Sequence, residues 1–289
     1  MAGSFFHLWL AQRIYDDFWG GRDGENGVKL KGALGAGSLA PDLGLFPGGP
    51  MRLSERIHRE RSGDFLRALL AAALSEEETA FVMGWGMHLY ADWAVHPWVD
   101  ERAGELFART GEGSADLWHM RVEWGVDGRL LEREEWDYLW SFPLHFPRPG
   151  VGEELLSRVG RAFYGEDADP VGVRSGAESI ERWMGRLPRI FLWCGKIHPR
   201  RRRAVPLLPR LLNRLTEKIL GGGLAGFPAW KTESALAKPW HPQRADLEEV
   251  EGLGEVAIQA FKKGWGEKFA SFPNRDLERE GFLSAIEDE

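Results

Sequence analysis

The sequence predicts an all-α protein, a helical bundle without a sheet, and three observations support this prediction. Apolar residues recur at helical spacing through most of the chain, and helix-start signals precede several of these stretches. Segments that alternate apolar and polar residues, as a half-buried strand does, are scarce. Glycine and proline gather in short stretches that separate the helical segments. The predicted helices cover residues 4–17, 53–74, 76–96, 115–134, 152–164, 173–198, 206–220, 244–271 and 276–287.

The boundaries of the first elements follow from glycine and proline. The helix at 4–17 follows Gly3 and ends before the pair Gly20-Gly21. The segment from Gly32 to Pro50 holds many glycines and prolines, and we predict that it is a loop.

Capping residues set the boundaries of the next helices. Ser75 precedes three glutamates, and its spacing to Glu78 fits a capping box, so a helix should begin there. Because Pro97 disfavours helical geometry in the residue before it, this helix should end just ahead of the proline. The following helix should be capped by Ser114 or Asp116.

Composition limits the class of protein. The chain has 289 residues, of which 43% are hydrophobic and 28% charged, as expected for a globular protein rather than a disordered one. Its formal net charge of −7 argues against a nucleic-acid binder that relies on a broad basic surface. Cys194 is the single cysteine, so an intrachain disulfide and a thiolate metal cluster are both excluded. Any bound metal must therefore be held by nitrogen and oxygen atoms.

The N-terminal segment lacks the features of a signal peptide. It has no basic region, and its apolar stretch from Phe5 to Leu10 is short and is interrupted by His7. No stretch approaches 20 apolar residues, so we expect no transmembrane segment and a cytoplasmic location. A proline-rich break at residues 142–152 predicts a metal-binding helical core at 1–145. The helical extension at 146–289 would pack on this core, and a single domain is left open.

The strongest chemical signal is a stripe of three polar residues on an apolar helix. His88, Asp92 and His96 are spaced four apart, and each step of four advances about 40° around a helix. Ionisable groups on such a face would be costly to bury without partners. A cation is a suitable partner, with His88 and Asp92 reaching one ion and His96 a second.

Further histidines and carboxylates can complete this set. His119 and Glu123 are also four apart, and with His96 they form a two-histidine, one-carboxylate group of the kind that binds catalytic zinc. Asp42 in the predicted loop and His58 on the next helix would join His88 and Asp92 in a neighbouring site. Two close cations can clamp the attacking and leaving oxygens of a phosphoryl displacement.

In order along the chain, these residues resemble the zinc-dependent phospholipase C and P1/S1-type nuclease group. The shared pattern is an early histidine, an aspartate in a Pro-Asp loop, a histidine, a His-x3-Asp-x(3–5)-His segment and a His-x3-Glu segment. The stretch Gly84–Asp92 and the His96-Pro97 pair look like the phospholipase branch. The resemblance covers about residues 5–127. The matching residues are His7, Asp42, His58, His88, Asp92, His96, His119 and Glu123.

The resemblance implies a helical fold of the phospholipase C/P1 nuclease type, here with additional C-terminal helices, and three zinc ions. One zinc would be held by Asp42, His58, His88 and Asp92, with Asp42 also positioning or deprotonating water. A second zinc would be held by the group of His96, His119 and Glu123. The third would be held by His7 and a bridging Asp92.

Two positions depart from the family pattern. Secreted members use the amino group of a processed N-terminus as a ligand of the third zinc, whereas this chain begins Met1-Ala2-Gly3 without a processing signal. We therefore predict two zinc ions and leave the third open. Choline-selective members place an aromatic residue directly after the loop aspartate, where this chain has Leu43. A preference for phosphatidylcholine is therefore not predicted.

Other classes fit parts of the pattern. A P1/S1-type single-strand nuclease uses the same metal set with aromatic platforms for bases, although the lack of disulfides and the His96-Pro97 segment favour lipids or small phosphodiesters. A di-iron carboxylate protein would need two Glu-x-x-His motifs, and only Glu55-x-x-His58 lies near the set. A non-catalytic structural zinc module would need just four ligands.

The sequence thus predicts a zinc-dependent hydrolase that cleaves phosphodiesters in the manner of phospholipase C, with water activated by metal. The alternatives are a single-strand nuclease and a non-catalytic metal-binding helical protein. The predicted partner is a phosphate ester, with phospholipids as one candidate and nucleic acid only under the nuclease alternative. The natural substrate, the role of residues 150–289 and the oligomeric state are left open.

Overall fold

The computed structural model describes residues 3–20, 22, 24–146, 151–193, 240–274 and 276. These residues form helices joined by turns, without a strand among them, so the predicted all-α class is confirmed. Within these ranges, no helix combines the length and apolar character needed to cross a bilayer. The α-helices are α1 Ser4–Trp19, α2 Glu25–Leu39, α3 Met51–Arg59, α4 Ser62–Ala72, α5 Glu76–Thr110, α6 Ala115–Leu130, α7 Val151–Tyr164, α8 Pro170–Met184, α9 Leu187–Trp193 and α12 Arg244–Gly266. Short 3-10 helices are η1 Ala40–Leu45, η2 Glu134–Ser141 and η3 Gly165–Ala168.

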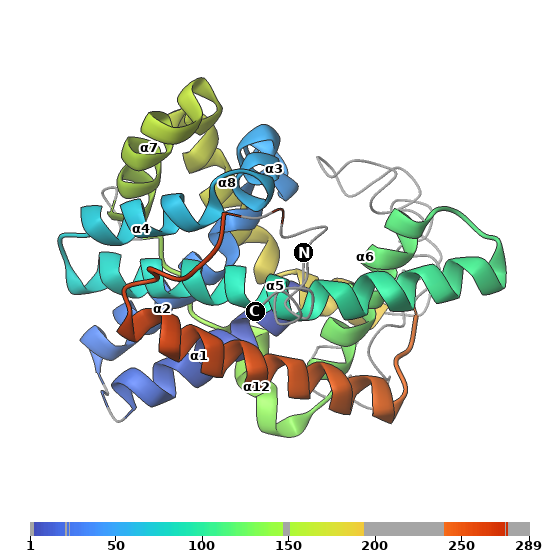
Figure 1. Ribbon diagram of the computed structural model, residues 1–289. Helices are drawn as coiled ribbons and strands as arrows, with labels where there is room; N and C mark the ends of the chain where they lie inside the picture. The colour runs from blue at the N-terminus through green and yellow to red at the C-terminus, as the bar shows by residue number, and fades with distance from the viewer. Residues whose placement is uncertain are drawn as a thin grey trace.

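Helix α5 runs through the middle of the bundle, where α1, α2, α4, α6, α7 and α12 pack directly against it. In Figure 1, α1, α2 and α12 lie on one side of α5, and α3, α4, α7 and α8 lie on the other. Its segment from Phe81 to Val99 is almost wholly buried, as the apolar sequence on all its faces requires. A helix surrounded in this way can present side chains to several neighbours at once, which is what a site assembled from distant segments needs.

The prediction that residues 32–50 form a loop is wrong for the first half of the segment. Helix α2 continues to Leu39 and η1 follows it directly. The glycines serve close packing here, because a Cβ at Gly37 would lie 1.9 Å from the Phe81 carbonyl oxygen, and one at Gly84 would lie 2.0 Å from the Leu34 oxygen. The two backbones therefore approach more closely than residues with a Cβ atom would allow. The packing gained in this way offsets the lower helix propensity of glycine, which costs about 1 kcal/mol per residue.

The single helix predicted for residues 53–74 is two helices, α3 and α4. Arg61 separates them in the left-handed region, with φ of 56°. Its guanidinium lies over the ring of Phe163 on α7, at 4.4 Å from the centroid, and this contact favours the bend. The contact links residues a hundred positions apart, so the local helical pattern carries no sign of it.

The predicted end of a helix at Pro97 is also wrong, because α5 continues past the proline to Thr110, and Gly111 caps it with φ of 64°. A proline inside a helix costs about 3 kcal/mol. The turns beyond it bury Trp98, Val99 and Leu106, and each such side chain contributes about 1.5–3 kcal/mol. Burial of this apolar face therefore outweighs the proline, and it extends the helix that carries the polar stripe.

The predicted caps agree with the structure, whereas two predicted helix ranges need correction. The capping box of Ser75 and Glu78 is present, and Ser114 rather than Asp116 caps α6 by accepting a hydrogen bond from the Leu117 N–H. The single helix predicted at 173–198 is two helices, α8 and α9, within its described part. The helix predicted at 244–271 is α12, which ends at Gly266. The predicted helices at 206–220 and 276–287, apart from residue 276, lie outside the described residues, as does Cys194.

Helices from both sides of residue 145 contribute to one hydrophobic core. Phe191 of α9 contacts the Phe5 ring of α1 edge-on, and Phe261 of α12 contacts Tyr90 of α5 in the same way. The division into a core at 1–145 and an extension at 146–289 stays a prediction.

Candidate metal centre

The carboxylate of Asp92 lies at the centre of a cluster of imidazoles. Its Oδ2 atom is 3.1 Å from His88 Nε2 and 3.3 Å from His58 Nε2. Its Oδ1 atom is 3.3 Å from His7 Nε2 and 3.5 Å from His96 Nε2. Helix α5 therefore places this carboxylate where α1 and α3 each supply a histidine, and its two oxygens face different histidine pairs.

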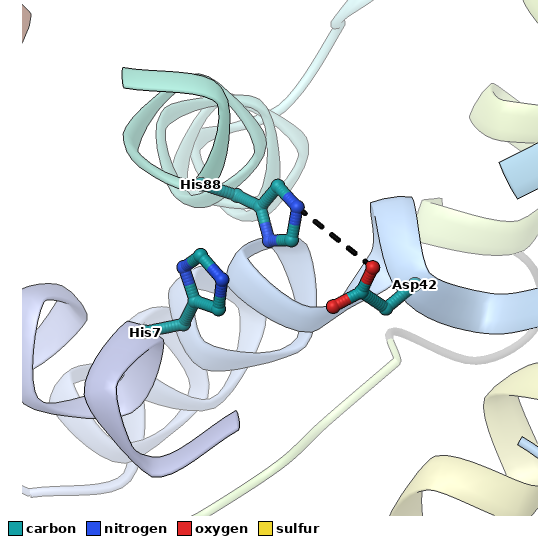
Figure 2. A group of neighbouring side chains, drawn as sticks. All are labelled: His7, Asp42 and His88. Carbon is teal, nitrogen blue, oxygen red and sulfur yellow. Dashed lines mark ion pairs between the residues drawn. The ribbon is translucent and has the colours of Figure 1, made fainter. Parts of the chain in front are cut away.

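Asp42 lies beside the first pair. Its Oδ1 atom is 3.5 Å from His58 Nε2 and 4.0 Å from His88 Nε2, and those two Nε2 atoms are 3.1 Å apart. His7 stacks on His88, with ring centroids 4.0 Å apart. Figure 2 shows the side chains of His7, Asp42 and His88 converging from α1, η1 and α5.

The second pair continues onto α6. His119 Nε2 is 2.9 Å from Glu123 Oε1, as the spacing of four predicts, and His96 Nε2 is 3.9 Å from the same oxygen. The rings of His96 and His119 are 5.3 Å apart, edge to face. The structure thus brings all eight residues singled out from the sequence into one continuous cluster.

Three subsets of this cluster have ligand atoms close enough to share an ion. In each subset the atoms lie within 4.8 Å of one another. The subsets are His7, Asp42 and His88; His58, His88 and Asp92; and His96, His119 and Glu123. All of these residues are buried except His119, whose side chain is 21% exposed. The third subset is therefore the one that reaches solvent.

Hydrogen bonds on the opposite ring nitrogen fix the direction of three imidazoles. His58 Nδ1 donates to the Ser54 carbonyl oxygen at 2.7 Å, and His88 Nδ1 donates to the Ser38 carbonyl oxygen at 2.9 Å. His119 Nδ1 donates to Asp100 Oδ1 at 2.7 Å. Because an acceptor holds the proton on Nδ1, the Nε2 atom is left as the electron-pair donor that a metal requires.

Sequence reasoning missed two carboxylates of this arrangement. Asp100 follows His96 by four residues on α5, and Asp127 follows Glu123 by four on α6. Asp127 accepts hydrogen bonds from the N–H groups of Phe5 and Phe6, at 3.1 and 2.9 Å. It thereby caps the helix that carries His7. Continuing each i, i+4 stripe by one more step would have found both residues.

Replacing Asp127 by alanine should destabilise the fold by about 2–3 kcal/mol, because a lost cap costs about 0.5–2 kcal/mol and a buried donor left unpaired about 1–3 kcal/mol. The free energy of urea unfolding measures this. Asp127→Asn is the matched variant, since its amide oxygen can still accept from Phe5 and Phe6. Equal losses in both variants would show that the hydrogen bonds to α1 do not stabilise the fold.

Burial and neighbouring charged groups strongly shift the pKa values of the cluster residues. Burial raises the pKa of Asp42 to about 6, although nearby imidazoles oppose this. Burial would also raise the pKa of Asp92, but the surrounding histidines hold it well below its usual range. Burial opposes protonation of His58 and His119, yet Asp92 and Glu123 respectively outweigh it and raise each pKa to about 9. In the metal-free protein, His58 and His119 therefore each carry a proton at a position where a metal cation would bind.

Several buried polar atoms have no hydrogen-bond partner among the described residues, and a bound cation would give them a partner. Both ring nitrogens of His7 and both carboxylate oxygens of Asp42 are buried without a hydrogen-bond partner among the described residues. Leaving such groups unpaired costs about 1–3 kcal/mol each, and more when they are charged. Imidazole nitrogen and carboxylate oxygen are donors that zinc accepts, and no thiolate is required. The donor set therefore fits zinc.

Comparison with known proteins agrees with this chemistry. The family model described as zinc dependent phospholipase C matches residues 6–163, which is more than half of the chain. The chain belongs to the zinc-dependent phospholipase C family. The matched range spans α1 to α7 and includes every residue of the cluster. Family membership and the three candidate metal groups together support metal binding by this cluster.

An uncharacterized protein of Archaeoglobus fulgidus is 30% identical over 139 residues. The aligned part makes up 45% of this chain and 38% of that protein, so the chain matches less than half of the relative's length. No solved structure matches this zinc-dependent phospholipase C family member.

Proposed function

We propose that the protein is a zinc-dependent phosphodiesterase that hydrolyses its substrate in the manner of phospholipase C. The observation that carries this proposal is the buried carboxylate of Asp92, whose two oxygens each lie within 3.5 Å of two imidazole nitrogens. A shared carboxylate of this kind can hold ions close together. Closely spaced cations are the arrangement that phosphoryl displacement uses.

The geometry supports a specific assignment of ligands. His58, His88 and Asp42 would hold one zinc together with one oxygen of Asp92. The other oxygen of Asp92 would hold a further zinc together with His7. The distance of 3.3 Å between His7 Nε2 and Asp92 Oδ1 supports this assignment. The remaining zinc would be held by the third subset, which includes the partly exposed His119.

Zinc ions bound here would lower the pKa of a water molecule and neutralise charge that develops on a phosphate. The chain's own contribution is orientation and proton acceptance. Asp42 would hold zinc through one oxygen. Its second oxygen is also buried without a hydrogen-bond partner in the described ranges, and we assign it the role of positioning water and accepting its proton. The exposed edge at His119 gives the substrate its direction of approach.

The substrate class is best described as a phosphate ester, with phospholipids as the favoured candidates. Leu43, which follows the loop aspartate, is fully buried, and its side chain packs against Gly176 of α8. It therefore belongs to the core rather than to a wall around a head group. This packing supports the expectation that the protein does not select choline lipids through this position.

A chromogenic phosphodiester such as bis(p-nitrophenyl) phosphate tests the proposal. Release of p-nitrophenol should fall to background after dialysis against a chelator, and added zinc should restore it. Phospholipid vesicles and single-stranded DNA of equal phosphate content would then be compared, with lipid cleavage expected to be the faster. Equal rates with and without chelator would end the proposal, and faster DNA cleavage would assign the nuclease function instead.

Zinc binding should depend on pH through the histidines. Because His58 and His119 each have a raised pKa of about 9 in the metal-free protein, both carry a proton at pH 7 that zinc must displace. Affinity should therefore rise between pH 6 and pH 9 and level off above that. Zinc addition in weak buffer at pH 7 should release two protons per chain from these residues. Proton release measured with an indicator dye checks this, and a pH-independent affinity would contradict it.

A further inference from the structure

Asp100 lies beside the cluster but belongs neither to the sequence pattern nor to the proposed set of zinc ligands. It lies on α5 beyond Pro97, one helical step of four after His96. Its Oδ1 atom accepts a hydrogen bond from His119 Nδ1 at 2.7 Å. The helix must continue through the proline for this contact to exist, so the unpredicted second half of α5 supplies it.

The contact differs from those of the other oriented histidines. His58 and His88 donate to the backbone carbonyls of Ser54 and Ser38, which are neutral and buried. His119 donates instead to a carboxylate whose side chain is 49% exposed. A carboxylate partner makes an imidazole a stronger metal donor than a carbonyl does, and it fixes the ring orientation.

We propose that Asp100 is a positioning residue that sets the zinc affinity of the group formed by His96, His119 and Glu123. This inference rests on the proposed zinc site. The Nδ1 proton of His119 stays on the Asp100 side, and the Nε2 atom stays aimed at Glu123, 2.9 Å away. Asp100 acts through His119, so it affects the ion of the group that reaches solvent. By strengthening this group's hold on its zinc, Asp100 slows the loss of that ion to solvent. The ions assigned to the other two sites do not depend on this carboxylate.

The variant Asp100→Asn tests the proposal in the full-length protein, with zinc binding measured by competition against a chromogenic chelator. The affinity of one zinc ion should fall by about 10–100-fold, while the remaining zinc should bind unchanged. Glu101→Gln is the matched control, since it removes an equal charge from the adjacent exposed position of the same helix. Asp100→Glu should recover part of the affinity because it restores a carboxylate.

Cobalt substitution gives a second measurement, the visible absorption of the bound ion, which would not change if Asp100 had only a structural role. The visible absorption of the cobalt ion in the solvent-facing group should change in Asp100→Asn and stay the same in Glu101→Gln. If Asp100→Asn binds every zinc ion within about twofold of the parent protein, with an unchanged cobalt spectrum, the proposal is wrong. A parent protein that binds zinc but cleaves no phosphodiester would refute the proposed function while leaving this inference standing.

Discussion

Replacing Asp92 by asparagine should reduce zinc-dependent hydrolysis by at least about 1,000-fold, because metal ions supply several kcal/mol of transition-state stabilisation and each 1.36 kcal/mol is a factor of ten. The amide keeps the size of the side chain, so the core around it stays filled. It removes the negative charge that four histidines share at distances of 3.1–3.5 Å. Initial rates on a chromogenic phosphodiester and zinc content by mass spectrometry measure the effect.

The control for this substitution is Asp116→Asn. Asp116 is exposed in the first turn of α6 and is not part of any of the three candidate metal groups. Its variant should keep the parent protein's zinc content and rate. An Asp92→Asn protein with full zinc content and more than a tenth of the parent rate would show that this carboxylate does not hold the ions.

Replacing Gly84 by alanine should destabilise the fold by about 3 kcal/mol or more, since overpacking costs about 1–3 kcal/mol and here the obstacle is backbone rather than a movable side chain. The added Cβ would lie 2.0 Å from the Leu34 carbonyl oxygen and 2.7 Å from the Ser38 amide nitrogen. Helix α2 would have to move away from α5. Such a loss is a large part of the about 5–15 kcal/mol that separates folded from unfolded protein.

The movement should also weaken the metal site. Ser38 accepts the Nδ1 hydrogen bond of His88 at 2.9 Å, so separating α2 from α5 lengthens the bond that orients this imidazole. Urea unfolding of the metal-free protein and zinc competition should therefore both report a loss in Gly84→Ala.

Gly104→Ala is the matched comparison, because Gly104 is on the same helix and a Cβ there meets nothing within 4 Å. Alanine at an open helical position should stabilise the protein by about 0.5–1 kcal/mol through its higher helix propensity. Opposite signs for the two glycines are the expected result. A neutral Gly84→Ala would show that the α2–α5 approach is looser than the contact distances indicate.

Local spacing was sufficient to find the residues of the candidate site. Two side chains four positions apart on a helix face the same way, whatever the rest of the chain does. His88 with Asp92, and His119 with Glu123, are therefore adjacent for local reasons. The order of the remaining histidines and Asp42 indicated the family, and the matching family model confirms that assignment.

Three errors in the predicted fold have a common cause. Local signals marked the α2 glycines as a loop and Pro97 as a helix end, and they gave no sign of the bend at Arg61. In each case a contact with a distant segment decided the outcome. The Phe81 backbone lies close against Gly37, the Phe163 ring packs against Arg61, and buried side chains extend α5 past its proline. Tertiary burial of several kcal/mol outweighs propensities of about 1–3 kcal/mol.

The sequence by itself determined the helical class, the types of candidate ligand atom and the pairs that share a helix face, because these depend on the residue types and on a repeat of 3.6 residues per turn. Only the tertiary structure decided that His7, Asp42 and His58 meet the α5 stripe, since each lies on a different helix. It also decided that Asp100 and Asp127 support the cluster. Which helices pack together depends on the summed burial of many side chains, and no short stretch of sequence contains that sum.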